Sequence, residues 1–207
     1  MRSRMLLALP VLVAGWLLAV ASPAAAYKLY GPLWRDDDLT YYNSYRPYDE
    51  FVDRGARVWN ASGMNARFRR VTSASKADVR IGLFSRPALP RIPPGTVGYT
   101  TLTILDKRVF VAGKVSLTLL TPDGVKKDRA MLQLIVNHEL GHAIGLDHDQ
   151  GTCALMNVQV RRGAGPEKCG TPPRGKRYCR MLELDDERGA MALYGGTPAP
   201  VTTPRSC

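Results

Sequence analysis

The chain has 207 residues, of which 45% are hydrophobic and 23% are charged. These fractions are ordinary for a globular protein and exclude a disordered or fibrous one, and the length predicts one domain. The formal net charge is +11. Such a charge favours either simple solubility or association with anionic cell-surface or matrix polymers, and it says nothing about the fold. No motif indicates specific binding of nucleic acid, and we expect a monomer.

The first 26 residues have the pattern of a secretory signal peptide. Two arginines are followed by an apolar run that ends at Val20 and by three alanines at 24–26, which match a cleavage site. A membrane anchor is the alternative, but Pro10 and Gly15 interrupt the run, and a span needs about 20 apolar residues. We therefore expect residues 1–26 to be removed and the protein to be secreted and extracellular. The formal charge then falls from +11 to +9, because two arginines and no acid are lost.

The first half of the chain after this segment contains strand patterns and one helix. Strands are predicted at 39–44, 67–71 and 77–84, and two or three more are predicted at 97–105, 108–112 and 114–120. Apolar residues at helical spacing predict a helix between Arg46 and Ser62. Residues 85–95 contain four prolines and are predicted to form a loop.

Two further helices are predicted in the second half. A long helix begins near Asp128 and ends near Gly145, and a closing helix runs over 184–194, before two glycines. The chain is thus divided into the signal peptide, one folded domain over 27–196 and a Pro/Thr-rich tail over 197–207.

All four cysteines lie in the last third of the chain. An even number in an exported protein predicts two disulfides. Three pairings are open, and short separations favour Cys153 with Cys169 and Cys179 with Cys207. A structural zinc site of four cysteines is the alternative, which the absence of a C-x-x-C pair disfavours.

The long helix carries the most specific pattern in the sequence. Residues 138–148 read H-E-L-G-H-A-I-G-L-D-H, and they contain all three histidines of the protein. On a helix His138 and His142 lie on one face. Gly145 can take a positive φ that ends the helix and lets His148 reach the same point.

Three neutral imidazoles leave a tetrahedral Zn²⁺ one open position, which is the pattern of a catalytic rather than a structural site. Glu139 follows the first histidine, and this places it beside a water on the metal rather than on the metal itself. We therefore expect one catalytic Zn²⁺ and a general base at Glu139.

The pattern of residues 138–148 resembles the metzincin clan of zinc peptidases. The segment Cys-Ala-Leu-Met-Asn that ends at Asn157 is similar to the Met-turn of that clan, with Met156 beneath the metal. The residues of both motifs are most similar to those of the matrixin family. Weaker matches occur at Trp59, 77–81 and 184–195. The resemblance implies an α+β zincin fold. In such a fold a twisted mixed β-sheet would be combined with two long helices above an active-site cleft and with a smaller, irregular C-terminal lobe that contains one helix.

The resemblance also implies that residues 27–196 are the catalytic domain of a zinc metalloendopeptidase. Its protein or peptide substrate would lie antiparallel to an edge strand, for which the candidate residues are Val97, Gly98 and Tyr99. A turn that leads into an interior strand is the alternative for this segment. The primary specificity pocket would be lined by Val158 and Val160, unless a basic side chain such as Arg161 or Arg162 points inward.

The departures from the family leave the exact family open. Asp149 follows the third histidine, where matrixins have a small polar residue, and Asn157-Val158 replaces Met-x-Pro, so the pocket wall cannot be copied. No tyrosine follows Met156 by two residues, which argues against a tyrosine ligand. No histidine is left for a second zinc, and no clear motif indicates Ca²⁺. The competing functions are a non-catalytic basic binding protein with this fold and a zinc hydrolase of non-peptide amides.

Overall fold

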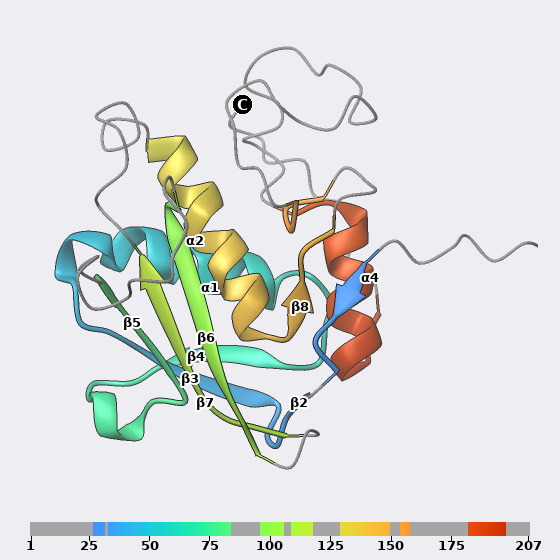
Figure 1. The fold of residues 1–207 in the computed structure, drawn as a ribbon, viewed down its shortest axis with the longest axis horizontal. Coiled ribbons are helices and arrows are strands. Elements are labelled where there is room, and N and C mark those ends of the chain that lie inside the picture. Colours follow the sequence, from blue (N-terminus) through green and yellow to red (C-terminus); the bar gives the residue numbers. More distant parts are fainter. Residues whose placement is uncertain are drawn as a thin grey trace, which may run out of the picture.

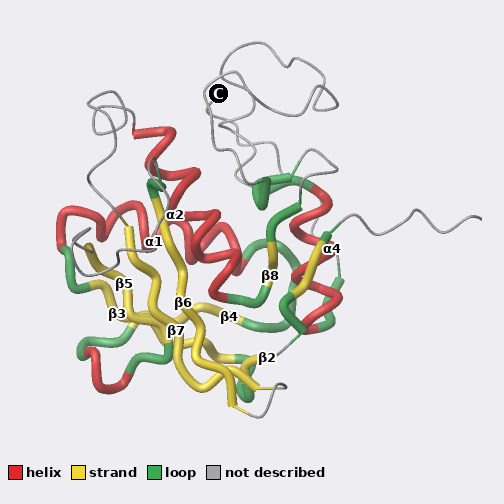
Figure 2. The backbone as a smooth tube through the Cα atoms, in the orientation of Figure 1, coloured by secondary structure: helices red, strands yellow, loops and turns green. Residues whose placement is uncertain are grey.

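The computed structural model describes residues 27–31, 33–83, 96–105, 109–117, 129–149, 154–157 and 182–197. In these ranges the helices α1 (Asp49–Asn60) and α2 (Arg129–Ala143) pack against each other and against a mixed β-sheet, and α4 (Leu184–Tyr194) lies beyond the end of α2 (Figures 1 and 2). The protein is therefore of the predicted α+β class, and this arrangement is compatible with a metzincin-like fold.

The sheet contains six strands. They are β2 (Leu33–Trp34), β3 (Asp38–Asn43), β4 (Arg67–Arg70), β5 (Val79–Leu83), β6 (Gly98–Leu105) and β7 (Val109–Leu117). The order β2-β7-β5-β3-β4 is parallel throughout, and β6 is antiparallel to β7. Residues alternate between buried and exposed along β5. This alternation indicates that one face of the sheet is covered by the helices and the other faces solvent.

Strand β6 lies at an edge of the sheet. β7 pairs with β5 through residues 113–117 and with β2 through residues 109–110, and it pairs with β6 along its whole length. Because β2 and β5 use different stretches of β7, they share one of its sides and leave the other to β6. Among the described strands, β7 is the sole partner of β6.

The sequence left open whether 108–112 and 114–120 form one strand or two, and the structure has the single strand β7 over the described part of this region. Gly113 lies inside this strand and pairs with Val79 on one side and Leu102 on the other. A Cβ on Gly113 would lie 3.3 Å from atoms of Leu102 and of Trp34. The glycine therefore makes room for two neighbouring side chains and does not interrupt the strand.

Short elements that the sequence did not predict complete the fold. The strands β1 (Lys28–Leu29) and β8 (Leu146–Asp147) form an antiparallel two-stranded sheet, which fixes the start of the described chain beside the end of α2. The 3₁₀ turns η1 (Arg46–Tyr48) and η2 (Ala74–Lys76) precede α1 and β5. Elements of two or three residues are too short to show a periodic pattern.

The two long helices cross closely, and this contact fixes the position of α2. A Cβ on Gly55 would lie 2.8 Å from Leu140 and 2.9 Å from Asn137, so the α1 backbone touches α2 directly. The indole of Trp59 donates a hydrogen bond of 2.9 Å to the backbone oxygen of Asn137. Since Asn137 precedes the first histidine, α1 is bonded to α2 where the motif begins.

No helix in the described ranges is long and apolar enough to cross a membrane. Several predictions of the sequence analysis lie outside the residues that the structure describes. These are the signal segment 1–26, the loop 85–95, the tail after Thr197, Val158 and Val160, and the cysteines Cys153, Cys169, Cys179 and Cys207.

Candidate metal centre

The three histidines meet where α2 ends. His138 and His142 lie one turn apart on this helix, and Gly145 takes a φ of 103°, which ends the helix as the sequence predicts. The chain then returns through β8 to His148. Nε2 of His148 lies 3.2 Å from Nε2 of His138 and 3.1 Å from Nε2 of His142. Within the described residues these side chains form the group that could hold a metal ion.

Backbone carbonyls fix the orientation of two of the rings. Nδ1 of His138 lies 2.8 Å from the oxygen of Leu155, and Nδ1 of His142 lies 2.8 Å from the oxygen of Leu146. Because a carbonyl oxygen can only accept, each Nδ1 carries the proton and each Nε2 presents a lone pair. This second contact is the usual way in which a protein orients a metal-binding histidine.

The geometry and charge of this donor set fit a zinc ion. Two Zn–N bonds of about 2.0–2.1 Å at a tetrahedral angle place their nitrogens about 3.3 Å apart, close to the 3.1 and 3.2 Å seen between the Nε2 atoms. Burial lowers the pKa of His138 to about 3 and that of His142 to about 4. Burial also lowers the pKa of half-buried His148. The rings are therefore neutral at pH 7, as metal binding requires.

Glu139 follows His138 on α2, and its carboxylate is directed at the edge strand β6. The side chain is 4% exposed, and the hydroxyl of Thr100 donates a hydrogen bond of 2.6 Å to Oε2. Burial raises the pKa of Glu139 to about 7, and the bond from Thr100 opposes this shift. A carboxyl group that titrates near neutral pH is suited to proton transfer. Thr100 lies within the predicted strand 97–105, but no pattern in the sequence connects it with Glu139.

The predicted substrate-binding residues lie at the start of β6. Val97 is partly buried against the core, and Tyr99 on the outer side of the strand is 39% exposed. Gly98 faces α2, where a Cβ would meet the carboxylate of Glu139. β6 thus has the edge position that the resemblance implies, and it runs past the buried glutamate.

The segment Ala154–Asn157 forms a turn beneath α2, as expected for a Met-turn. Met156 is 3% exposed, and its backbone oxygen accepts a hydrogen bond of 3.0 Å from the amide of Asp149. A Cβ on Gly141 would collide with the sulfur of Met156 and would lie 3.0 Å from Trp59. The methionine therefore packs directly under the helix, between the two turns that carry His138 and His142.

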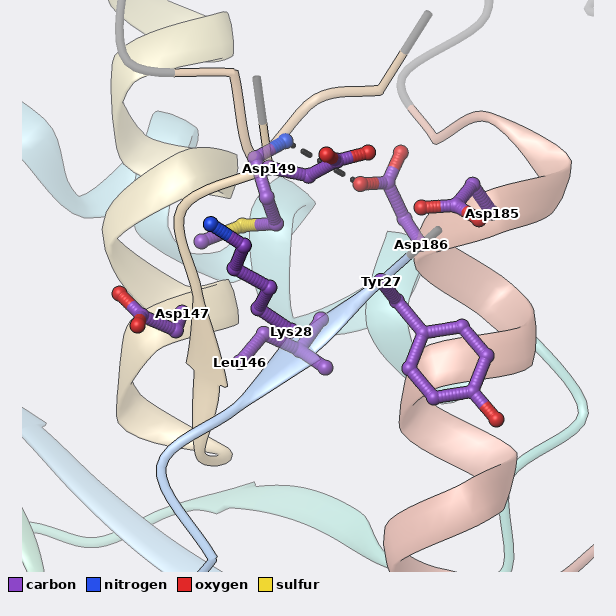
Figure 3. A pocket seen from close by; sticks show the side chains of 8 residues that line it. Tyr27, Lys28, Leu146, Asp147, Asp149, Asp185 and Asp186 are labelled. Atoms are coloured by element: carbon purple, nitrogen blue, oxygen red, sulfur yellow. Dashed lines mark hydrogen bonds between the residues drawn. The ribbon is translucent and has the colours of Figure 1, made fainter. Parts of the chain in front are cut away.

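Asp186 on α4 holds this turn in place, a role that the sequence did not reveal. Its buried carboxylate accepts hydrogen bonds from the amides of Leu155 (2.8 Å), Met156 (3.1 Å) and Glu183 (2.8 Å). Figure 3 shows this carboxylate directed at the Met-turn, in a small pocket between β1, β8 and α4 that none of the three histidines lines. In the sequence, Asp186 is only one of several acids in the first turn of the predicted helix 184–194.

Tyr30, which follows β1, also contacts the centre. Its hydroxyl lies 3.5 Å from Nδ1 of His142, and the two ring centroids are 5.9 Å apart. The amide of Tyr30 donates a hydrogen bond of 2.9 Å to the oxygen of Gly145. The start of the described chain therefore covers the outer side of one histidine.

No protein-family profile matches this chain. The chain is similar to metalloendoproteinase 1-MMP of Arabidopsis thaliana, with 24% identity over 180 residues that cover 81% of this chain and 46% of that protein. It therefore spans about half the length of the curated relative that it matches. This distant similarity and the cluster of three histidines support a matrixin-like zinc metalloendopeptidase at the level of the family.

Proposed function

We propose that the protein is a secreted zinc-dependent endopeptidase. The observation that carries this proposal is a group of three imidazoles, with the Nε2 atom of His148 3.2 and 3.1 Å from those of the other two, on the helix that also carries the buried Glu139 next to His138. The similarity to a plant metalloendoproteinase gives independent support.

His138, His142 and His148 would hold the ion through Nε2. When bound, zinc supplies a Lewis acid that polarises a carbonyl group and lowers the pKa of water toward neutrality. Glu139 takes a proton from the attacking water and passes it to the nitrogen of the leaving amine. Its raised pKa suits both halves of this task, since the carboxyl group can accept and release a proton near pH 7.

The substrate would be a peptide that lies extended along β6. This strand offers an edge that no other described strand covers, and an extended peptide can pair with such an edge through backbone hydrogen bonds. Val97, Gly98 and Tyr99 would contact the peptide. Export through the signal segment 1–26 and contact with anionic polymers through a formal charge of +9 are part of the proposal.

A non-catalytic binding protein with the same fold is the competing function. Burying a carboxyl group lowers the stability of a protein. A binding protein would gain no function from the buried Glu139, whose pKa is raised to about 7, that offsets this loss. The observed burial of Glu139 favours the enzyme.

The test is to incubate residues 27–207 with a diverse peptide mixture and identify the cleaved bonds by mass spectrometry. We expect hydrolysis that a chelator abolishes and added zinc restores. Glu139→Gln should bind zinc normally and lose about 10²–10⁴-fold in rate, whereas Glu50→Gln, an exposed glutamate on α1, should match the wild type. Hydrolysis that survives either the chelator or Glu139→Gln would refute the mechanism, and zinc binding without any hydrolysis would favour the binding protein.

A further inference from the structure

Two residues of β6 surround the carboxylate of Glu139. The hydroxyl of Thr100 lies 2.6 Å from Oε2 and 3.1 Å from the backbone oxygen of the same residue. A hydroxyl has one proton to donate, and hydrogen bonds to a carboxylate are shorter and stronger than those to a carbonyl. Thr100 therefore donates to Oε2.

Gly98 determines where the second oxygen lies. A Cβ at this position would collide with Oε1 and would lie 2.7 Å from Cδ and 2.8 Å from Cγ of Glu139. Oε1 thus occupies the space that any other residue would fill with its side chain. Because Gly98 and Thr100 share the face of β6 that points at α2, together they fix both oxygens of the carboxylate.

Packing alone does not require the hydroxyl of Thr100. A valine has nearly the same shape and would suit a strand that packs on a helix. A carboxylate that is 4% exposed, however, needs a hydrogen-bond donor, because burying it without one costs far more than burying an apolar group. Thr72, an exposed threonine between β4 and η2 and outside β6, provides a control for the same substitution.

We infer that Thr100 is a positioning residue for the general base, an inference that rests on the proposed function. Its hydroxyl engages Oε2 and leaves Oε1, beside Gly98, as the oxygen that takes up the proton. In the reaction an O–H bond of water breaks and an Oε1–H bond forms while the water oxygen attacks the carbonyl carbon. The proton then moves from Oε1 to the amine nitrogen as the C–N bond breaks, and the water oxygen remains in the new carboxyl group.

The kinetic test compares Thr100→Val, Thr100→Ser and the control Thr72→Val, each checked for one bound zinc. A base that is displaced by a fraction of an ångström to about 1 Å lowers the rate of the chemical step by up to about 10²-fold. We therefore expect Thr100→Val to lower kcat by about 10–100-fold with KM nearly unchanged. Thr100→Ser restores the hydroxyl and should recover most of kcat, and Thr72→Val should match the wild type.

A second measurement needs neither zinc nor activity. In metal-free protein, the urea midpoint is compared for Thr100→Val in the wild-type and Glu139→Ala backgrounds, as a double-mutant cycle. Removal of the hydroxyl leaves the buried carboxylate without its donor, so Thr100→Val should lower the midpoint in the wild-type background. In the Glu139→Ala background it should leave the midpoint unchanged or raise it.

The outcomes separate this inference from the proposed function. Wild-type protein that binds zinc and hydrolyses no peptide overturns both. If the wild type is active, then an unchanged kcat in Thr100→Val, a loss carried by KM, or a Thr100→Ser variant as slow as Thr100→Val overturns the positioning role alone. Equal midpoint shifts in the two backgrounds would also overturn it, because they would show that Thr100 and Glu139 do not interact.

Discussion

Replacing Asp186 with alanine tests whether α4 holds the Met-turn and, through it, a histidine of the metal centre. The substitution removes the acceptor of three amide hydrogen bonds, from Leu155, Met156 and Glu183. The Met156 bond is buried, and the other two are partly buried. Leu155 is also the residue whose backbone oxygen accepts the Nδ1 proton of His138.

The expected loss of stability follows from these three bonds. A buried amide without an acceptor costs about 1–3 kcal/mol, and an amide that water can reach costs less. Allowing about 2 kcal/mol for Met156 and about 0.5 kcal/mol for each of the other two gives a loss of about 3 kcal/mol. For a domain of this size each kcal/mol lowers the melting temperature by about 2–4 °C, so we expect a decrease of about 6–12 °C.

The assay is thermal unfolding of the metal-free protein, followed by circular dichroism at pH 6. Asp36→Ala, an exposed acid in the loop between β2 and β3, is the control and should melt with the wild type. Zinc affinity is measured separately and should fall by about 10–100-fold in Asp186→Ala, because the residue that orients His138 is released. Melting within about 1 °C of the wild type would refute the structural role of Asp186.

The contribution of the Asp186 carboxyl group to folding stability should change with pH in a defined direction. Burial raises the pKa of Asp186 to about 7, and its three hydrogen bonds oppose this. Because the folded protein then binds a proton more tightly than the unfolded chain, the contribution of this carboxyl group to stability falls as pH rises from about 4 to 7. The stability difference between the wild type and Asp186→Asn should fall by at most about 4 kcal/mol over this range. A difference that does not change with pH would contradict the shift.

Three further predictions address the metal and the C-terminal third of the chain. His148→Ala should reduce bound zinc from one per chain to a substoichiometric amount while the circular dichroism spectrum is retained, and an unchanged zinc content would exclude this ligand. Burial lowers the pKa of all three rings, to about 3 for His138 and about 4 for His142, so zinc affinity should begin to fall at a lower pH than it would with ordinary histidines. Competition titrations from pH 5 to 8 would contradict this if affinity followed ordinary histidines with a pKa near 6.5. Mapping of unreduced peptides should show two disulfides among the four cysteines, and four free thiols in secreted protein would refute them.

The sequence predicted best the elements whose signals are local. The helix α4 has the predicted bounds, and α2 begins within one residue of the expected position. The change in chain direction after Gly145 was also predicted, because a glycine at that position of the motif can take the positive φ that ends the helix. In each case the evidence lies within about one or two helical turns of the residue concerned.

Contacts between distant segments could not be predicted in this way. Thr100 and Glu139 are 39 positions apart, and Leu155 and Asp186 are 31 apart. The pattern of β6 shows that a threonine there is compatible with a strand, but not which helix residue it will face. The strand pair β1 and β8 was missed for the same reason, since two residues have no periodicity and their partner is more than 100 positions away.

The two buried carboxyl groups show what the sequence leaves undetermined. Glu139 and Asp186 both lie on helices, and burial raises the pKa of each to about 7. They differ in their hydrogen-bond donors. Asp186 accepts from three backbone amides through both of its oxygens, so its position is fixed and three of its about four acceptor sites are occupied. At Glu139, Thr100 donates to Oε2 alone, and under the proposed function Oε1 is left to exchange a proton. The number and placement of donors thus separates the structural carboxylate from the reactive one, and both depend on packing between segments far apart in the chain.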